Sequence, residues 1–519
     1  MAGSNGKGPH APSEYPPPVD SVKEFIKHGL DDEDERIDVG VAIVGGGTAG
    51  LACANRLLQL LGDDEALMER LGEVPVAVIE KAKTCGGHNL SGAVMRPGPL
   101  QELFPDLSRE DWRKEHFAFG EVTKEAVYML PTGKTKLRIP PPPPFKNHGN
   151  EVVSVAAMAR YQAAQAEEGG AYILTETSAT QLIVDDGKVV GVRSGDKGRG
   201  KDGEPLGNFE PGTDIKAEVT VLAEGCWGHL TGAAIKQFEL ADGREPQVWE
   251  LGVKEVWKVP KPLDRIIHTI GPWPLKLSAK YGQIGGTWLY PMKDEKTGDD
   301  LVSIGFVVDL EYADATTSVH DLLQQFKLHP LVKGILEGGE RVAWGAKALP
   351  GGGYWSMPKL TMPGALLVGD SAGMVDTVAL KGVHHCIKSG KLAAEAIYNS
   401  LKNAESLESY EQAVEESSIG QELYQVRNAR QPFQKGFIRG GPLVNLAIAT
   451  KGKLPSGRLA WHRNDQKPLF VGDAGGMVDA AALKGVHHCI KSGILAGDAI
   501  YASLKRGTPL ESYEQAIED

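Results

Sequence analysis

The apolar positions of the chain fall into short runs, and helical spacing follows the first of them. Asp38–Val44 reads DVGVAIV, a β-branched run typical of a strand that is buried on both faces. Leu51–Leu61 then repeats apolar residues at the spacing of a helix. Further short apolar runs at Val74–Ile79, Ala217–Glu224 and Leu366–Val368 predict more strands. Buried strands joined by helical stretches predict an α/β fold with a parallel sheet.

A glycine-rich turn, Gly45 to Gly50 (GGGTAG), connects the first strand to the first helix. In such a turn Gly45 permits the tight bend, Gly47 lets the backbone approach a pyrophosphate, and Gly50 lets the helix pack on the strand. The start of the helix adds free N–H donors and the positive end of the helix dipole. Strand, turn and helix together predict a dinucleotide site.

A carboxylate at the end of the second strand supports this prediction. Glu80 follows Val74–Ile79 and could bond the adenosine ribose hydroxyls. It lies 30 residues after Gly50, and the insert LLGDDEALMERLGEVP explains the long spacing. Lys81 and then Gly86, Gly87 and His88 resemble the flavin-side loop of glutathione-reductase-type enzymes. These features favour FAD over NAD as the dinucleotide.

A third element, near residue 370, strengthens the prediction of FAD. The run Leu366–Val368 ends in Gly369 and Asp370. In FAD hydroxylase-like folds an aspartate at this place bonds the ribityl hydroxyls, and the helix that follows points its N-terminus at the flavin ring. The strand at Ala217–Glu224 is expected to return the chain to the same domain.

The segment that contains Asp370 occurs twice. Val368–Glu416 and Val471–Asp519 share 35 of 49 aligned positions at a constant offset of 103 residues. We expect the first copy to hold the flavin, because the loop-like run LAWHRNDQKP precedes the second copy and its Asp473. The alternative is that the second copy replaces the first and residues 369–471 loop out, which such a long excursion disfavours.

Adjacent histidines raise the question of a metal site. His384, His385 and Cys386 recur as His487, His488 and Cys489. Neighbouring side chains on a helix point about 100° apart, so they chelate poorly, whereas zinc helices use i and i+4. We therefore predict no metal.

Composition narrows the class of protein. The net charge of −12 over 519 residues argues against binding to nucleic acid. The chain has no apolar run of 18 residues, and its N-terminus has neither a signal-peptide core nor a transit-peptide pattern. The five cysteines are scattered, which predicts a reducing compartment and no cysteine-ligated iron–sulfur cluster.

A specific resemblance covers residues from about 38 to about 468. The chain resembles electron-transfer flavoprotein–ubiquinone oxidoreductases and their bacterial relatives linked to nitrogen fixation. General FAD folds lack the LSGA, NHGN and KG-x-H runs that occur here. The matching stretches are GGGTAGLACANRL, HNLSGAV (His88–Val94), QELFPDL (Gln101–Leu107), KNHGNEVV (Lys146–Val153), LAEGCWGHL (Leu222–Leu230), IGGTWLYP (Ile284–Pro291), LEGGERVAWGAKAL (Leu336–Leu349), KLTMPGALLVGDSAG (Lys359–Gly373), LKGVHHCIKSG (Leu380–Gly390) and ELYQVRNAR (Glu422–Arg430).

The resemblance implies an FAD enzyme on a membrane surface that passes electrons from an electron-transfer flavoprotein to a quinone. It places Gly285 and Gly286 against the quinone head group, where a Cβ would block close approach. It places Gly382 and His384 beside the flavin. The apolar stretch Pro442–Ala449 would form a membrane-facing patch or, alternatively, a core helix.

The implied fold is a glutathione-reductase-type discontinuous FAD domain with a mixed-sheet cap. The expected divisions are a flexible lead-in (1–36), the FAD domain (37–100, 150–245 and 345–420), the cap and quinone site (101–149 and 246–344), a helical surface segment (421–470) and the duplicated copy (471–519).

The chain also departs from the family pattern. After residue 468 it continues into the second copy, where the family has an iron–sulfur domain. Electrons would therefore reach FAD directly or through a separate ferredoxin-like subunit. With no signal or transit peptide, the expected location is cytoplasmic, at the inner face of a bacterial-type membrane. Other readings remain open: a monooxygenase or prenyl reductase on the same framework, or a non-catalytic flavin-binding protein. No catalytic acid–base pair is evident.

Overall fold

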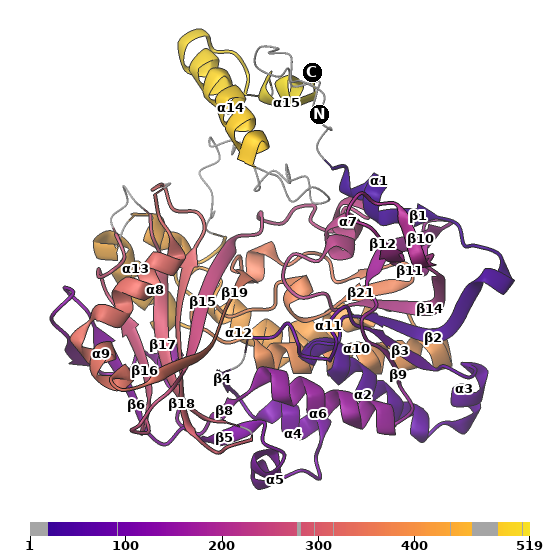
Figure 1. Cartoon of the computed structure of the whole chain (residues 1–519), viewed down its shortest axis with the longest axis horizontal. Coiled ribbons are helices and arrows are strands. Elements are labelled where there is room, and N and C mark those ends of the chain that lie inside the picture. The colour runs from indigo at the N-terminus through magenta and orange to yellow at the C-terminus, as the bar shows by residue number, and fades with distance from the viewer. Residues whose placement is uncertain are drawn as a thin grey trace. The chain divides into compact units, whose positions relative to one another are not determined.

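The computed structural model describes residues 19–458, except 91, 278–281, 295, 315 and 436, and residues 486–518, except 511. The chain divides into two compact units. The larger consists of Phe25–Ser194 and Thr213–Trp461, and it holds both large sheets (Figure 1). The smaller includes Gly195–Gly212 and the C-terminal helices.

The first large sheet has a parallel centre. Strand β2 (Arg36–Val44) lies between β3 (Val76–Ile79) and β14 (Asp214–Leu222), and all three run parallel. Residues 41–44 of β2 are buried, as their apolar sequence predicts. The remaining members are β1 (Ile26–His28), β9 (Tyr172–Leu174), β10 (Ala179–Asp185), β11 (Lys188–Ser194), β20 (Thr361–Met362) and β21 (Ala365–Leu367).

Helices pack closely around this sheet. Helix α2 (Thr48–Gly62) contacts α10 (Val383–Asn403) along much of its length and also contacts α6 (Val155–Glu168). The approach of α10 is close because Gly390 faces the backbone of α2. Smaller helices complete this part: α3 (Glu65–Arg70), α4 (Gly98–Leu103), α5 (Arg109–Lys114), α7 (His229–Gln237) and α11 (Ser409–Glu416).

The second large sheet is almost wholly antiparallel, and only β16 and β6 run parallel. Helices α8 (Val319–Leu328) and α9 (Pro330–Leu336) contribute Phe326 and Leu336 to a core shared with Phe306 of the sheet. In spatial order the strands are β19 (Glu340–Pro350), β15 (Trp249–Lys258), β18 (Asp300–Asp309), β17 (Gly285–Lys293), β16 (Ile266–Ile270), β6 (Glu125–Met129) and β7 (Leu137–Ile139).

The large unit also contains a three-stranded sheet and several short helices. The small sheet is β4 (Ala93–Met95), β8 (Glu151–Val153) and β5 (Ala118–Glu121). The short helices are η2 (Glu33–Glu35), η3 (Pro143–Phe145), η4 (Tyr354–Ser356), η5 (Gly369–Ala372), α12 (Ser418–Val426), η6 (Gln431–Lys435) and α13 (Phe437–Ala449).

The smaller unit contains a hairpin and two C-terminal helices. Strands β12 (Lys197–Arg199) and β13 (Pro205–Glu210) pair antiparallel. Helix α14 (Val486–Arg506) packs on α15 (Ser512–Glu518) through a small apolar cluster around Ala496, Ala499 and Tyr513. Helix α1 (Ser21–Phe25) crosses the boundary between the two units.

The expectation of a flexible lead-in through residue 36 is wrong for residues 26–36. Strand β1 pairs parallel with β10 at the sheet edge. Asp31 and the fully buried Asp214 share Arg193, whose Nη1 lies 2.6 Å and 2.7 Å from their carboxylate oxygens, and Lys27 contacts both carboxylates. Paired charges thus hold Asp31, the first residue of the acidic run DDEDE, against the sheet edge.

The structure bears on two other features predicted from the sequence, the domain boundary at residue 345 and the repeated segment. The cap boundary at residue 345 falls inside β19, which pairs with β15 from Glu340 to Pro350, so the strand belongs to the second sheet as a whole. Immediately before the first copy of the repeat, β21 pairs with β14 within the first sheet. Asp473, the corresponding aspartate of the second copy, lies outside the described residues.

A pair of equivalent glycines tests which copy supports the fold. A Cβ at Gly390 of α10 would lie 2.1 Å from the backbone oxygen of Ala49, whereas a Cβ at Gly493 of α14 would meet nothing within 4 Å. We expect Gly390→Ala to lower the free energy of unfolding by about 1–3 kcal/mol. Gly493→Ala should change it by about 1 kcal/mol or less, towards greater stability, through helix propensity. Denaturant unfolding of both full-length variants gives the comparison, and equal losses would contradict it.

Candidate functional site

The glycine turn lies at the carboxyl end of β2, where the parallel strands β3 and β14 also end. Gly45 has a φ of 114°, and a Cβ there would lie 2.3 Å from the carbonyl oxygen of Ala223. A Cβ at Gly50 would lie 2.2 Å from the Gly45 oxygen. Gly47, by contrast, has open space where its Cβ would be. Two of the glycines therefore serve packing, and the third leaves a free surface at the start of α2.

Glu80 sits beside this turn at the end of β3. Its Oε2 accepts a hydrogen bond of 2.8 Å from the Gly46 N–H, and its Oε1 accepts one of 2.7 Å from the Ala82 N–H. The carboxylate is buried and held in one orientation by these two bonds. Each oxygen keeps a second lone pair that a ligand hydroxyl could use. Lys81 and His88, which the sequence also suggests, are exposed.

Gly369 and Asp370 lie against the same turn. Gly369 has a φ of 60° and donates its N–H to Ser389 Oγ at 3.0 Å. A Cβ on Gly369 would lie 2.9 Å from the Cβ of Ala49, so the tip of β21 touches the first turn of α2. Burial raises the pKa of Asp370, whose Oδ1 accepts from Cys386 Sγ at 3.5 Å. The structure thus brings the glycine turn, Glu80 and Asp370 to one edge of the first sheet.

A mainly apolar cavity of 240 Å³ lies against the second sheet, and Gly285 and Gly286 line it. A Cβ at Gly285 would lie 2.1 Å from the Val307 oxygen, so this glycine permits the close pairing of β17 with β18. A Cβ at Gly286 would find only Leu380 Cδ1, at 4.0 Å, and would otherwise project into open space. The apolar walls include Phe145, Ile284, Val307, Leu380, Val444 and Ile448.

A buried ionic group forms part of the cavity wall. Arg430 forms ion pairs with Glu250 and with Asp309, the latter at 2.5 Å, and donates to Thr377 Oγ1 at 3.0 Å. Two carboxylates thus share one guanidinium, and burial raises the pKa of Glu250. Neither Glu250 nor Arg430 is among the site residues that the sequence predicts. Its signals were Glu250 in the strand that faces the cavity and Arg430 in the family-like run ELYQVRNAR.

Helix α10 begins next to this cavity. Gly382 caps the helix, and the preceding residue, Lys381, is buried with its Nζ bonded to the Ala379 oxygen at 3.1 Å. Burial lowers the pKa of Lys381 to about 8. Because Leu380 lines the cavity and Asp370 lies beside the glycine turn, the segment 370–382 runs between the cavity and that turn.

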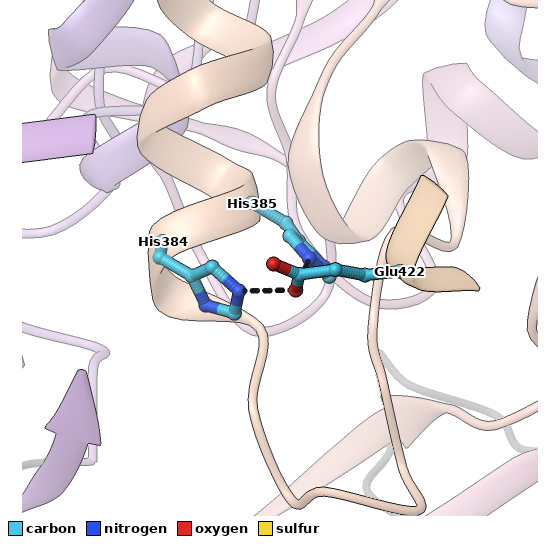
Figure 2. A group of neighbouring side chains, drawn as sticks. All are labelled: His384, His385 and Glu422. Atoms are coloured by element: carbon cyan, nitrogen blue, oxygen red, sulfur yellow. Dashed lines mark hydrogen bonds and ion pairs between the residues drawn. The ribbon is translucent and has the colours of Figure 1, made fainter. Parts of the chain in front are cut away.

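His384 and His385, in the first turn of α10, both contact Glu422 of α12 (Figure 2). Their Nε2 atoms lie 3.0 Å and 2.9 Å from the same carboxylate oxygen, Oε2. Although neighbouring side chains leave a helix about 100° apart, these two imidazoles therefore reach the same carboxylate oxygen. Burial lowers the pKa of His384 to about 4. Burial alone would raise the pKa of Glu422, but the two histidine hydrogen bonds outweigh it and hold that pKa well below its usual range.

The expected membrane-facing stretch forms α13, which contributes Gly441, Val444, Asn445 and Ile448 to the cavity. Leu446 of the same helix is exposed. Within the described part of the chain, no helix combines the length and apolarity needed to cross a bilayer.

Sequence comparison finds relatives over most of the chain. Residues 249–349 match the family model "ETF-QO, ubiquinone-binding". The chain is 38% identical over 429 residues to the mitochondrial electron transfer flavoprotein-ubiquinone oxidoreductase of Sus scrofa, covering 80% of this chain and 66% of that protein. It is 37% identical to the enzyme of the same name from Oryza sativa subsp. japonica, covering 81% and 70%. The chain thus spans about two thirds of the length of these relatives.

Solved structures resemble the fold at low sequence identity. A geranylgeranyl bacteriochlorophyll reductase-like protein from Thermoplasma acidophilum gives a TM-score of 0.57 at 19% identity and covers 80% of this chain and 92% of its own. A myxobacterial chondrochloren halogenase, a variant of FAD-dependent halogenases, gives 0.54 at 17% identity and covers 80% and 91%. Likeness at this level concerns the fold, a mixed α/β architecture of the kind seen in FAD-dependent enzymes.

The shared guanidinium predicts a pH-dependent loss of stability in one variant. Arg430→Met leaves Glu250 and Asp309 buried without a cation, which should cost about 3 kcal/mol or more near neutral pH. Burial already raises the pKa of Glu250, and without the guanidinium this pKa should lie further above the unfolded value. The loss should therefore grow as pH rises and shrink towards about pH 5.

Denaturant unfolding at several pH values measures this effect. Arg458→Met, which removes an exposed pair with Glu245, is the control and should cost less than about 1 kcal/mol at every pH. An Arg430→Met loss that is small or independent of pH would show that the two carboxylates do not depend on this guanidinium.

Proposed function

This chain belongs to the electron transfer flavoprotein–ubiquinone oxidoreductase family, and we propose that it binds one FAD and passes electrons from an electron-transfer flavoprotein to a membrane quinone. The observation that carries the proposal is the cavity beside Gly285 and Gly286. Gly285, Gly286 and much of the remaining wall belong to the segment that matches the ubiquinone-binding model, and the loop that leads from Asp370 to α10 also lines the cavity. One short segment, 370–382, thus joins the acceptor cavity to the sheet edge that carries the glycine turn, Glu80 and Asp370, which we call the dinucleotide edge.

The residues at the dinucleotide edge fit FAD. Gly47 leaves room for a pyrophosphate at the N-terminus of α2, Glu80 is placed for the adenosine ribose, and Asp370 is placed for the ribityl hydroxyls. Gly382 and His384 would lie on the flavin side. When bound, FAD supplies the reversible two-electron chemistry, and the protein orients it and excludes water.

We assign FAD binding to a glutathione-reductase-type discontinuous domain made of residues 37–100, 150–245 and 345–420. The parallel strands that meet at the dinucleotide edge come from all three segments. The antiparallel sheet formed largely by 246–344 then serves as the cap. Most of the cavity wall comes from this sheet and from α13.

The cavity suits a quinone head group. Its surface is mainly apolar, and the backbone of Gly286 is accessible because no side chain covers it. Reduction of a quinone to a quinol takes up two protons. Burial favours the protonated form of Glu250, so this carboxyl can hold a proton at the cavity wall, where Arg430 fixes its position.

Peripheral contact with a membrane would bring the quinone to this cavity. We propose α13 as the contact, because Val444 and Ile448 line the cavity while Leu446 of the same helix is exposed. The proposed location is the inner, cytoplasmic face of the membrane. Electrons would come from the flavoprotein partner directly or through a separate ferredoxin-like subunit.

A monooxygenase or prenyl reductase could use the same framework, and anaerobic reduction separates these functions. With an electron-transfer flavoprotein as donor, the bound flavin should be reduced and then reoxidised by a soluble quinone. NADPH should leave it oxidised. Reduction by NADPH, or no reduction by any electron-transfer flavoprotein, would overturn the proposal.

The three acidic residues of the dinucleotide edge and its repeat can be compared directly. Glu80→Ala and Asp370→Ala each remove a carboxylate that accepts hydrogen bonds from FAD hydroxyls, worth about 1.5–3 kcal/mol, so flavin affinity should fall about tenfold or more. Asp473→Ala in the second copy should leave affinity unchanged. Flavin content after gel filtration and titration of the apoprotein measure the effect. An equal loss in Asp473→Ala would reverse the assignment of the copies.

The open position of Gly286 allows the cavity to be filled without disturbing the sheet. Gly286→Val should raise the KM for quinone about tenfold or more, because the added side chain occupies the space of the head group. Reduction of the flavin by its protein donor should be unaffected. Gly334→Ala in α9, where a Cβ meets nothing within 4 Å, is the control. An unchanged KM for quinone in Gly286→Val would show that the quinone does not bind in this cavity.

A further inference from the structure

The group formed by His384, His385 and Glu422 has no part in the proposed electron transfer beyond its nearness to the flavin side. One ligand atom from each residue lies within 4.8 Å of the other two. Both histidines are buried and Glu422 is partly exposed. Figure 2 shows the two imidazoles, from one helix turn, directed at a carboxylate from a different helix.

The hydrogen bond that His385 makes through Nδ1 leaves its Nε2 facing a carboxylate oxygen without a proton between them. Its Nδ1 lies 3.2 Å from the backbone oxygen of Met374, which can only accept, so Nδ1 carries a proton. In the neutral imidazole, Nε2 then presents a lone pair to Glu422 Oε2 at 2.9 Å. Two acceptors at this distance repel each other. A positive charge between them, either a second proton on the ring or a metal ion, is needed to make the contact favourable.

The donor set and its surroundings fit a metal ion. Two imidazole nitrogens and one carboxylate oxygen are ligands that zinc and related transition metals prefer. The bond from His385 Nδ1 to the Met374 carbonyl is the outer contact that ligating histidines commonly make. Arg96 pairs with Oε1 of Glu422, which leaves Oε2 as a single-oxygen ligand. The Nε2 to Oε2 separations of 3.0 Å and 2.9 Å need to open by only a few tenths of an ångström for bonds of about 2.0–2.2 Å.

The charges around the group can also accommodate a cation. Two cations, Arg96 and Lys381, interact with Glu422, while two carboxylates, Asp370 and Asp376, interact electrostatically with His385. The partly exposed Glu422 side chain offers a route from solvent.

We propose that Nε2 of His384, Nε2 of His385 and Oε2 of Glu422 bind one divalent transition metal of the zinc class, with water at the fourth position. The ion would join the start of α10 to α12. It would thereby fix the loop from Asp376 to Lys381, which separates the dinucleotide edge from the cavity. Its role is structural, and it is separate from the electron path.

The repeated sequence supplies a matched control. His487 and His488 stand in the same run, VHHCIKSG, in the second copy. The full-length protein without a histidine tag would be loaded with Co²⁺ and, separately, with Zn²⁺, then freed of loosely bound metal by dialysis. Metal content per chain and the visible ligand-field bands of Co²⁺ are the two readouts.

The proposal predicts one tightly held ion in the wild type and in His487→Ala/His488→Ala. Glu422→Gln and His385→Ala should each weaken binding about tenfold or more and change the Co²⁺ bands. Unfolding temperature and flavin content show whether these variants remain folded. Wild-type protein with no stoichiometric ion would show that a proton alone occupies the group. Equal losses in both histidine pairs, or none in Glu422→Gln, would equally overturn the site.

Discussion

The close packing of α10 on α2 is the contact on which the arrangement of both functional places depends. Glycines make it possible: Gly390 lies against the backbone of α2, and Gly369 lies against Ala49 at the start of the same helix. This contact brings the tip of β21, with Asp370, onto the turn that β2 supplies. Residues more than 300 positions apart thereby form one edge that suits an extended dinucleotide.

A second constraint acts at the cavity. Arg430 joins Glu250 of β15 and Asp309 of β18 to the segment that follows α12, and it also reaches Thr377 in the loop before α10. Burial makes each of these charges costly without the others. The same group therefore fixes the wall of the cavity and places an ionisable carboxyl beside it. Under the proposed function, this is the place where a quinone and its protons would be needed.

Local sequence patterns predict the dinucleotide edge well. Strand β2, its glycine turn, Glu80 and the Gly369–Asp370 tip all follow from apolar runs and turn residues that lie next to each other. The pattern does not reveal β1, which is three residues long and held by pairing with β10 and by the ion pair of Lys27 with the distant Asp214. Nor does it reveal the Glu250–Arg430 pair, because 180 positions separate the two residues.

The group of His384, His385 and Glu422 is likewise not predictable from local sequence patterns. Helical spacing predicts the direction in which each side chain leaves the backbone. It does not predict that His384 and His385 both rotate towards a carboxylate on α12. Only the packing of α12 near the start of α10 supplies Glu422. Relations of this kind depend on tertiary contacts, which no periodicity encodes.

The central claim is that one glycine turn and one aspartate strand tip, both from the larger unit, hold a single FAD. The flavin-to-protein ratio of the purified full-length chain, determined by absorbance after denaturation and by quantitative amino-acid analysis, tests it most directly. The account predicts one FAD per chain. A ratio of two would show that the repeated segment also holds a flavin, and a ratio of zero after reconstitution with excess FAD would contradict the claim altogether.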